Sequence, residues 1–187
     1  MTVAVEFDQK KRDRLREGLH QYALKRGDFV LASGARSNFY INIKELSLRG
    51  EFLHLIGELL WPMMAEMKPD AVGGMTLGAD PIVSAVTMVA AGQGVDCPAL
   101  IVRQELKDHG TGRRIEGSFE RGMRVAVVED VTTTGGSAKR AADAIIEAGG
   151  IVVGVFSVMN RESGADQLFA DLNWPFQAIF GMGDLDL

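Results

Sequence analysis

Residues 125–137 read Val-Ala-Val-Val-Glu-Asp-Val-Thr-Thr-Thr-Gly-Gly-Ser, and the prediction of the fold starts from them. The four apolar residues are typical of a strand buried in a parallel sheet. Two acids and a Thr/Gly loop then lead into apolar residues at helical spacing, and Gly149-Gly150 ends that helix. These helical positions are Ala138, Ala141, Ala142, Ile145 and Ile146. The stretch therefore predicts a strand, a loop and a helix in an α/β fold.

The loop between this strand and this helix is suited to bind an anion. Free backbone N–H groups at a helix N-terminus favour a phosphate, and the loop adds the hydroxyls of residues 132–134 and Ser137. It is neither a Walker A loop nor a dinucleotide fingerprint, because no Lys follows the glycines and their spacing differs. The preceding acids, Glu129 and Asp130, favour a ligand with ribose hydroxyls, or a Mg²⁺ ion on those hydroxyls. An ordinary turn with solvated acids is the alternative that the loop alone leaves open.

The whole ordered string resembles the phosphoribosyl pyrophosphate (PRPP) motif of type I phosphoribosyltransferases. Three further segments resemble one branch, orotate phosphoribosyltransferase. They are Phe-Val-Leu-Ala-Ser-Gly and Ser-Asn-Phe-Tyr within residues 29–40, Arg103 with Lys-Asp-His-Gly at residues 107–110, and Asn160-Arg161. The resemblance covers nearly the whole chain. It implies an α/β type I phosphoribosyltransferase fold: a mainly parallel twisted sheet flanked by helices, a small N-terminal hood and a flexible catalytic loop.

The resemblance also implies an activity and the residues that perform it. The expected reaction is transfer of 5-phosphoribosyl from PRPP to orotate, which forms orotidine 5′-monophosphate and pyrophosphate in UMP biosynthesis. The implied catalytic residues are Lys107, His109, Glu129 and Asp130. The implied PRPP-binding residues are these four together with Arg103, Gln104, Val131, Thr132, Thr133, Thr134, Gly135, Gly136 and Ser137. The implied orotate-binding residues are Tyr40, Ile41, Thr133 and Arg161, whose planar guanidinium suits a carboxylate.

A cofactor and a partner follow from the same resemblance. Mg²⁺ is expected to be held mainly by PRPP, near Glu129 and Asp130, without a dedicated set of protein ligands. A homodimer is expected, in which Arg103 and the lid residues reach the neighbouring subunit's site. PRPP and orotate are the expected small-molecule partners.

Length and composition set further bounds. The 187 residues suggest a single phosphoribosyltransferase domain over residues 1–187, with the hood at about 1–45. Apolar residues make up 47% and charged residues 24%, and the net charge of −5 argues against a nucleic-acid partner. No apolar run approaches the ~18 residues that predict a membrane span. The single cysteine, Cys97, fits a reduced, cytoplasmic setting.

Residues 104–119 show no clear periodicity, which predicts a long loop. Basic residues gather there: Arg103 stands at its base and Lys107, His109, Arg113 and Arg114 follow within it. Loops longer than about 12–15 residues in compact domains are usually functional or disordered. A positive loop with several glycines in an acidic protein suits a lid that captures an anion. A solvated charged hairpin is the alternative.

The other elements are predicted from periodicity and from Gly and Pro positions. We expect a helix over 7–25 that Gly27 ends, then hood strands at 29–32 and 39–43 around a turn at 33–36. Further expected helices cover 51–67, 82–91 and 163–172, and further expected strands cover 70–74, 98–103, 151–159 and 176–180.

Several positions depart from the family's pattern. Gln104, Ala32 and Gly78 stand where lysine is usual or frequent, and Asn160 replaces a frequent Asp. Two other functions therefore stay open: a phosphoribosyltransferase for another nucleobase, and a non-catalytic PRPP-binding regulator. Arg161 argues against the first. Lys107 with His109 argues against the second, whereas Gln104 favours it.

Overall fold

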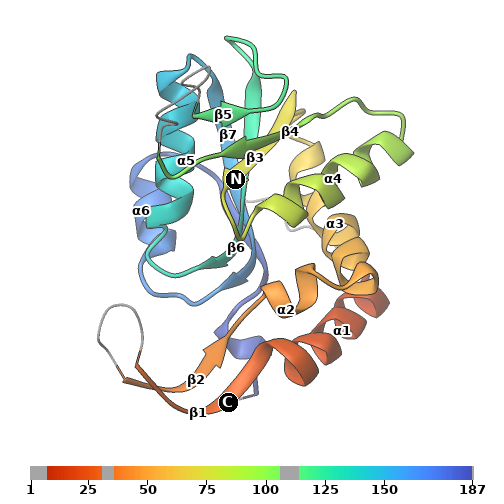
Figure 1. Ribbon diagram of the computed structural model, residues 1–187, viewed down its shortest axis with the longest axis vertical. Helices are drawn as coiled ribbons and strands as arrows, with labels where there is room; N and C mark the ends of the chain where they lie inside the picture. Colours follow the sequence, from red (N-terminus) through yellow and green to blue (C-terminus); the bar gives the residue numbers. More distant parts are fainter. Residues whose placement is uncertain (1–7, 31–35, 106–113, 187) are drawn as a thin grey trace.

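The computed structural model describes residues 8–30, 36–105 and 114–186. Within these residues a six-stranded sheet has the strand order β5-β4-β3-β6-β7-β8, and a separate two-stranded sheet forms the hood (Figure 1). The strands of the large sheet are β3 (Ala71–Met75), β4 (Ala99–Val102), β5 (Ile115–Glu116), β6 (Arg124–Thr132), β7 (Ile151–Asn160) and β8 (Phe176–Phe180). Its neighbouring strands pair in parallel except β4 with β5. The predicted fold class is confirmed.

The inner strand β6 shows why the sheet is covered on both faces. Successive side chains of a strand point to opposite faces, so Val125 and Val127 join one core cluster while Ala126 and Val128 join the other. The first cluster lies under α5 (Gly136–Glu147) and α6 (Ala165–Asp171), and the second under α3 (Gly50–Ala65) and α4 (Asp80–Gly92). Figure 1 shows these two helical layers on either side of the sheet. Because β6 is buried on both faces, it needs a continuous run of apolar residues.

The connections after β3 and β6 leave the sheet in opposite directions. The chain runs from β3 through α4 to β4 on one side, and from β6 through α5 to β7 on the other. Because β3 and β6 are parallel neighbours, their carboxyl ends flank a crevice, the usual ligand site of open α/β sheets. The fold therefore places the loops after Met75 and Thr132 on the two sides of one site.

The hood differs in detail from the prediction. Its elements are α1 (Gln9–Gly18), the π-helix η1 (Leu19–Ala23), β1 (Leu24–Val30), β2 (Arg36–Ile41) and α2 (Lys44–Ser47). Helical structure ends at Ala23, and Gly27 lies inside β1 at a register shift, so the prediction that Gly27 ends the helix is wrong. The reason is that residues 24–26 pair with residues 39–41 of β2, which uses their backbone groups in the hairpin.

The end of the described chain fastens the hood. The short 3-10 helix η2 (Met182–Asp184) follows β8, and Asp184 lies 2.6 Å from the guanidinium of Arg12 on α1. Arg26 of β1 donates a hydrogen bond to the carbonyl of Asp186 at 2.8 Å. Figure 1 shows this terminal segment beside β1. Two elements of the hood, α1 and β1, are thus attached to this terminal segment.

Most other boundaries agree with the prediction within a few residues, and the strand at 176–180 is confirmed. Ile146 was expected on the apolar face of α5 but is 45% exposed. Each further residue of a helix rotates the side chain by about 100°, so Ile146 points away from the direction of buried Ile145.

Residues 104–119, which were predicted to form a long loop, contain the short strand β5, while residues 106–113 lie outside the described residues. None of the helices in residues 8–30, 36–105 and 114–186 could cross a membrane.

Gly57 marks the closest packing between α3 and α4. A Cβ atom at this position would lie 2.8 Å from the carbonyl oxygen of Ala85, so the two helices would have to move apart. We expect Gly57→Ala to lower the free energy of unfolding by about 1–3 kcal/mol, measured by urea denaturation. Gly92→Ala is the matched control, because a Cβ atom there meets nothing within 4 Å. Equal stability of the two variants would contradict this account of the helix packing.

Candidate active site

Two carboxylates lie at the carboxyl end of β6. Glu129 is 6% exposed and Asp130 is 9% exposed. None of the described residues donates a hydrogen bond to Oε2 of Glu129, although that atom is buried. Burial first, and then the adjacent charge of Asp130, raises the pKa of Glu129 to about 9. Glu129 is therefore protonated at neutral pH, with an oxygen that lacks a partner.

Asp130 is held by three elements. The backbone N–H of Val131 donates to its Oδ1 at 2.8 Å, and Nζ of Lys44 on α2 lies 3.3 Å from its Oδ2. On the third side, a Cβ atom at Gly78, in the loop after β3, would come within 2.5 Å of the carboxyl group. Lys44 was not among the predicted site residues. In the sequence, Lys44 is notable only because it follows the second hood strand, and this place does not indicate a contact with residue 130.

The loop after β6 forms a small cavity at the start of α5. The cavity measures about 130 Å³, and its described lining consists of Glu129, Val131, Thr132, Thr133, Thr134, Gly135, Gly136, Ser137, Ala138 and Arg140. Gly135 is the N-cap with φ 81°, a conformation that favours glycine, and it has no side chain to occupy the first N–H groups of the helix. The predicted anion loop therefore faces a real hollow.

Hydrogen bonds from the next strand and helix fix this loop. The carbonyl of Thr132 accepts from the N–H of Arg161 at 2.8 Å, and the carbonyl of Thr133 accepts from Ala165 at 3.2 Å. The side chain of Thr132 is 1% exposed, whereas Thr133 and Thr134 are exposed. Thr132 can therefore face a ligand through its backbone, while the other two threonines offer their hydroxyls.

The hood brings the predicted base-binding residues to this edge of the sheet. The guanidinium of Arg161 lies 4.8 Å from the ring centroid of Phe39 on β2. Tyr40 is 41% exposed, and its ring lies 5.7 Å from that of Phe29. Ile41 is buried in the core, so its side chain does not face the site. Arg161 thus links the Thr loop to Phe39 of β2, whereas Tyr40 contacts Phe29 within the hood.

A second hollow of about 690 Å³ lies beside the loop after β3. Its described lining includes Thr76, Asp80, Arg103, Gln104 and Glu116. The amide of Gln104 donates to the carbonyl of Thr76 at 3.3 Å, and Nε of Arg103 donates to Glu116 at 2.9 Å. The structure therefore brings Arg103 and Gln104 close to the loop after β3. Lys107 and His109 lie outside the described residues.

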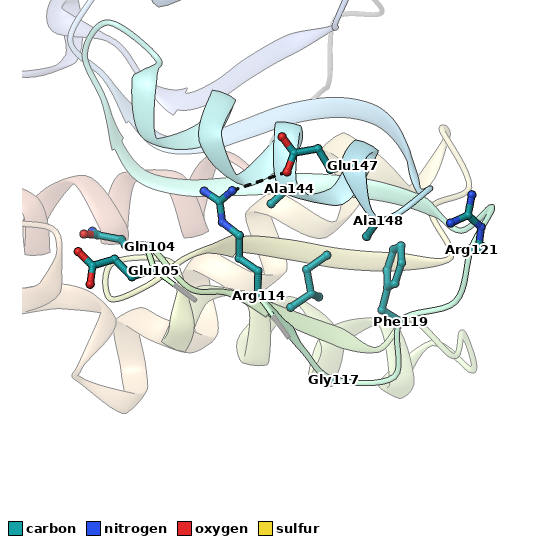
Figure 2. Close-up of a pocket in the computed structure, with 10 residues that line it drawn as sticks. Gln104, Glu105, Arg114, Gly117, Phe119, Arg121, Ala144, Glu147 and Ala148 are labelled. Atoms are coloured by element: carbon teal, nitrogen blue, oxygen red, sulfur yellow. Dashed lines mark ion pairs between the residues drawn. The ribbon is translucent and has the colours of Figure 1, made fainter. Parts of the chain in front are cut away.

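A third cavity, of about 830 Å³, lies between β5 and α5. Figure 2 shows Arg114 directed toward Glu147 of α5, with their charged groups 3.9 Å apart, and Arg121 and Phe119 at the other end. Nε of Arg114 also donates to the carbonyl of Arg103 at 3.3 Å. Arg114 therefore extends over α5 toward Glu147.

Metal-ligating side chains do not cluster in the described residues: they contain no group of three or more His, Cys, Asp or Glu that could hold a metal ion.

Comparison with known proteins agrees with this geometry. The chain is 43% identical over 181 residues to the orotate phosphoribosyltransferase of Corynebacterium glutamicum, and the match covers 97% of each chain. The chain belongs to the orotate phosphoribosyltransferase family. A second family member, from Nostoc sp., is 43% identical over 93% of this chain and 84% of its own length. No protein-family model matches the chain.

Solved structures of family members share the architecture. The Mycobacterium tuberculosis orotate phosphoribosyltransferase in complex with PRPP superposes with a TM-score of 0.81 at 34% identity, and the match covers 95% of this chain and 99% of that one.

Glu129 gives the first prediction for the site. Because its pKa is raised in the folded state, its ionisation favours the unfolded chain, and folding stability falls as pH rises from about 4.5 to about 9. We expect Glu129→Gln to raise the free energy of unfolding by about 1–3 kcal/mol at pH 8. We expect this gain to disappear well below pH 4.5, where the side chain is protonated in both states.

Chemical denaturation at several pH values checks this. The control is Glu120→Gln, which removes the same charge from an exposed position. A pH-independent difference between Glu129→Gln and the unmodified protein would contradict the buried, raised-pKa carboxyl group.

Proposed function

We propose that this member of the orotate phosphoribosyltransferase family transfers the 5-phosphoribosyl group from PRPP to N1 of orotate, forming orotidine 5′-monophosphate and pyrophosphate in de novo pyrimidine biosynthesis. The observation that carries the proposal is the pair of acids, Glu129 and Asp130, beside a loop whose cavity of about 130 Å³ opens at the start of α5. Acids suited to a ribose diol and amides suited to a phosphate thus adjoin each other.

Each part of the two substrates has a place in this scheme. The 5′-phosphate binds the backbone of residues 131–137, and Glu129 with Asp130 accepts hydrogen bonds from the ribose hydroxyls. Pyrophosphate lies by the loop after β3, with Gln104 of the same chain and Arg103 of the neighbouring subunit beside it. Orotate lies between the hood and the Thr loop, where Arg161 binds its carboxylate and Thr133 its ring. Tyr40 flanks the ring with its side chain and Ile41 with its backbone.

The reaction breaks the bond between C1 of ribose and the pyrophosphate oxygen, and forms a bond from C1 to N1 of orotate. The proton that N1 loses balances the proton that pyrophosphate gains. As the first bond lengthens, positive charge develops on the ribose ring and negative charge on pyrophosphate. The carboxylate of Asp130 favours the positive ring. Arg103, Lys107 and His109 stabilise the leaving pyrophosphate, and His109 donates a proton to it. The closed lid excludes water, which would otherwise hydrolyse PRPP.

We propose Mg²⁺ as the metal ion. Carboxylate and hydroxyl oxygens are ligands that Mg²⁺ prefers, and the ionised carboxylate of Asp130 beside the proposed ribose site fits an ion held mainly by PRPP. When bound, the ion neutralises charge on the pyrophosphate.

We also propose a cytoplasmic homodimer. Met88 on α4 is 75% exposed and Leu77 in the preceding loop is 70% exposed, which supports a subunit contact over this helix. In such a dimer Arg103 and the lid residues would act at the neighbouring subunit's site. The single cysteine, Cys97, is a free thiol in the structure, which suits a reducing compartment.

The base specificity decides between this proposal and its alternatives. We expect pyrophosphate release from PRPP with orotate, and little with uracil, adenine or hypoxanthine, in a coupled assay of the Mg²⁺-loaded enzyme. Turnover only with a base that lacks the carboxylate would assign the enzyme to another nucleobase. PRPP binding by calorimetry without turnover of any base would favour a regulator.

Arg161 gives a second test, directed at the acceptor. We expect Arg161→Ala to raise the KM for orotate about 10- to 100-fold and to change the KM for PRPP little, because a charge-assisted hydrogen bond to a carboxylate is lost. The control is Arg49→Ala, since Arg49 also lies over an aromatic ring, that of Tyr22 at 4.1 Å, but within the hood. An equal rise in both KM values would point to a structural role for Arg161.

A further inference from the structure

The residues predicted to bind the 5′-phosphate carry no positive charge. Residues 131–137 are Val, Thr, Gly and Ser, whereas Glu129 at the same cavity is an acid. Among the described residues that line the cavity, Arg140 is the one cation. It stands on α5, beyond the PRPP motif, and is exposed.

The side chain of Arg140 folds back over the start of α5. Its NH2 group donates a hydrogen bond to Oγ of Ser137 at 3.0 Å. Its NH1 group would lie 3.5 Å from a Cβ atom built at Gly136. Side chains on a helix lean toward its N-terminus, so a residue in the second turn covers the first turn. The guanidinium therefore lies beside the N–H groups that face the cavity.

The neighbouring lysine behaves differently. Nζ of Lys139 lies 2.7 Å and 3.0 Å from the two carboxylate oxygens of Asp143, one turn further along the helix. Lys139 is not among the described residues that line the cavity. Two adjacent cations of α5 thus point in different directions, and only Arg140 faces the loop.

Electrostatics favour a cation at this position. A phosphate monoester carries a charge near −2 at neutral pH, and the carboxyl groups of Glu129 and Asp130 lie at the preceding strand end. The helix N-terminus supplies only about half a positive charge. The charge of Arg140 lowers the pKa of Glu129, against the larger raising effects of burial and Asp130, so its field extends into the site.

We infer that Arg140 is a ligand of the 5′-phosphate of PRPP, acting together with Ser137. The planar guanidinium suits two oxygens of one phosphate. Ser137 accepts a hydrogen bond from Arg140 and keeps its own O–H to donate to a phosphate oxygen. The inference rests on the proposed function, because it concerns the phosphate of that donor. It explains how an acidic protein compensates the phosphate charge without a lysine in the loop.

The test compares Arg140→Gln with Lys139→Gln, which removes the same charge from the adjacent position. We expect Arg140→Gln to raise the KM for PRPP about 10- to 100-fold, with kcat and the KM for orotate within about threefold of the unmodified enzyme. We expect Lys139→Gln to leave all three within about threefold. Arg140→Lys should recover part of the loss, because it restores the charge without the planar fork.

A readout without turnover accompanies the kinetics. Inorganic phosphate, the probe, should raise the melting temperature of the unmodified protein and of Lys139→Gln, and should have a smaller effect on Arg140→Gln. Equal KM values and equal phosphate effects for the two Gln variants would overturn the assignment. If the unmodified protein turned over no base, the proposed function would fail, whereas a phosphate effect that depends on Arg140 would still support the ligand assignment.

Discussion

The packing of Gly78 against Asp130 is the contact on which the arrangement of the site depends. It joins the loop after β3 to the end of β6, two parallel neighbours whose chains continue in opposite directions. Any side chain at Gly78 would displace the carboxyl group, so the approach of the two loops requires glycine there. Glu129 lines the small cavity at the start of α5, and the hollow beside Arg103 and Gln104 lies along the loop after β3.

The second organising principle is a separation of charge. The acids lie at the end of a buried strand, where burial keeps Glu129 protonated, and the cations arrive from the elements around it. Lys44 comes from the hood, Arg161 from the end of β7 and Arg140 from α5. The two adjacent acids are tolerated at the strand end because one is neutral and the other is paired with Lys44.

The sequence predicted those features that depend on neighbouring residues. The strand β6, the Thr/Gly loop and α5 follow one another in the sequence, and each was predicted from the order of neighbouring residues. Contacts over long separations were not predictable: Lys44 meets Asp130 across 86 positions of the chain, and nothing near residue 44 indicates it. The expected helix was predicted to end at Gly27, but residues 24–26 instead pair with β2. The periodicity of nearby residues carries no information about this pairing. The direction of side chains could not be predicted from the sequence either. Lys139 and Arg140 are adjacent and have the same charge, but Lys139 contacts Asp143 and Arg140 contacts Ser137 at the start of α5.

The attachment of the hood to residues 182–186 has a consequence for assembly. Arg12 and Arg26 belong to the part of the chain that is translated early, but their partners Asp184 and Asp186 follow the last strand of the sheet. During synthesis the hood must therefore wait, without these charged contacts, until the entire sheet has emerged from the ribosome. The hood is thus translated before the segment that fastens it, and its attachment can form only after residues 182–186 have been synthesised.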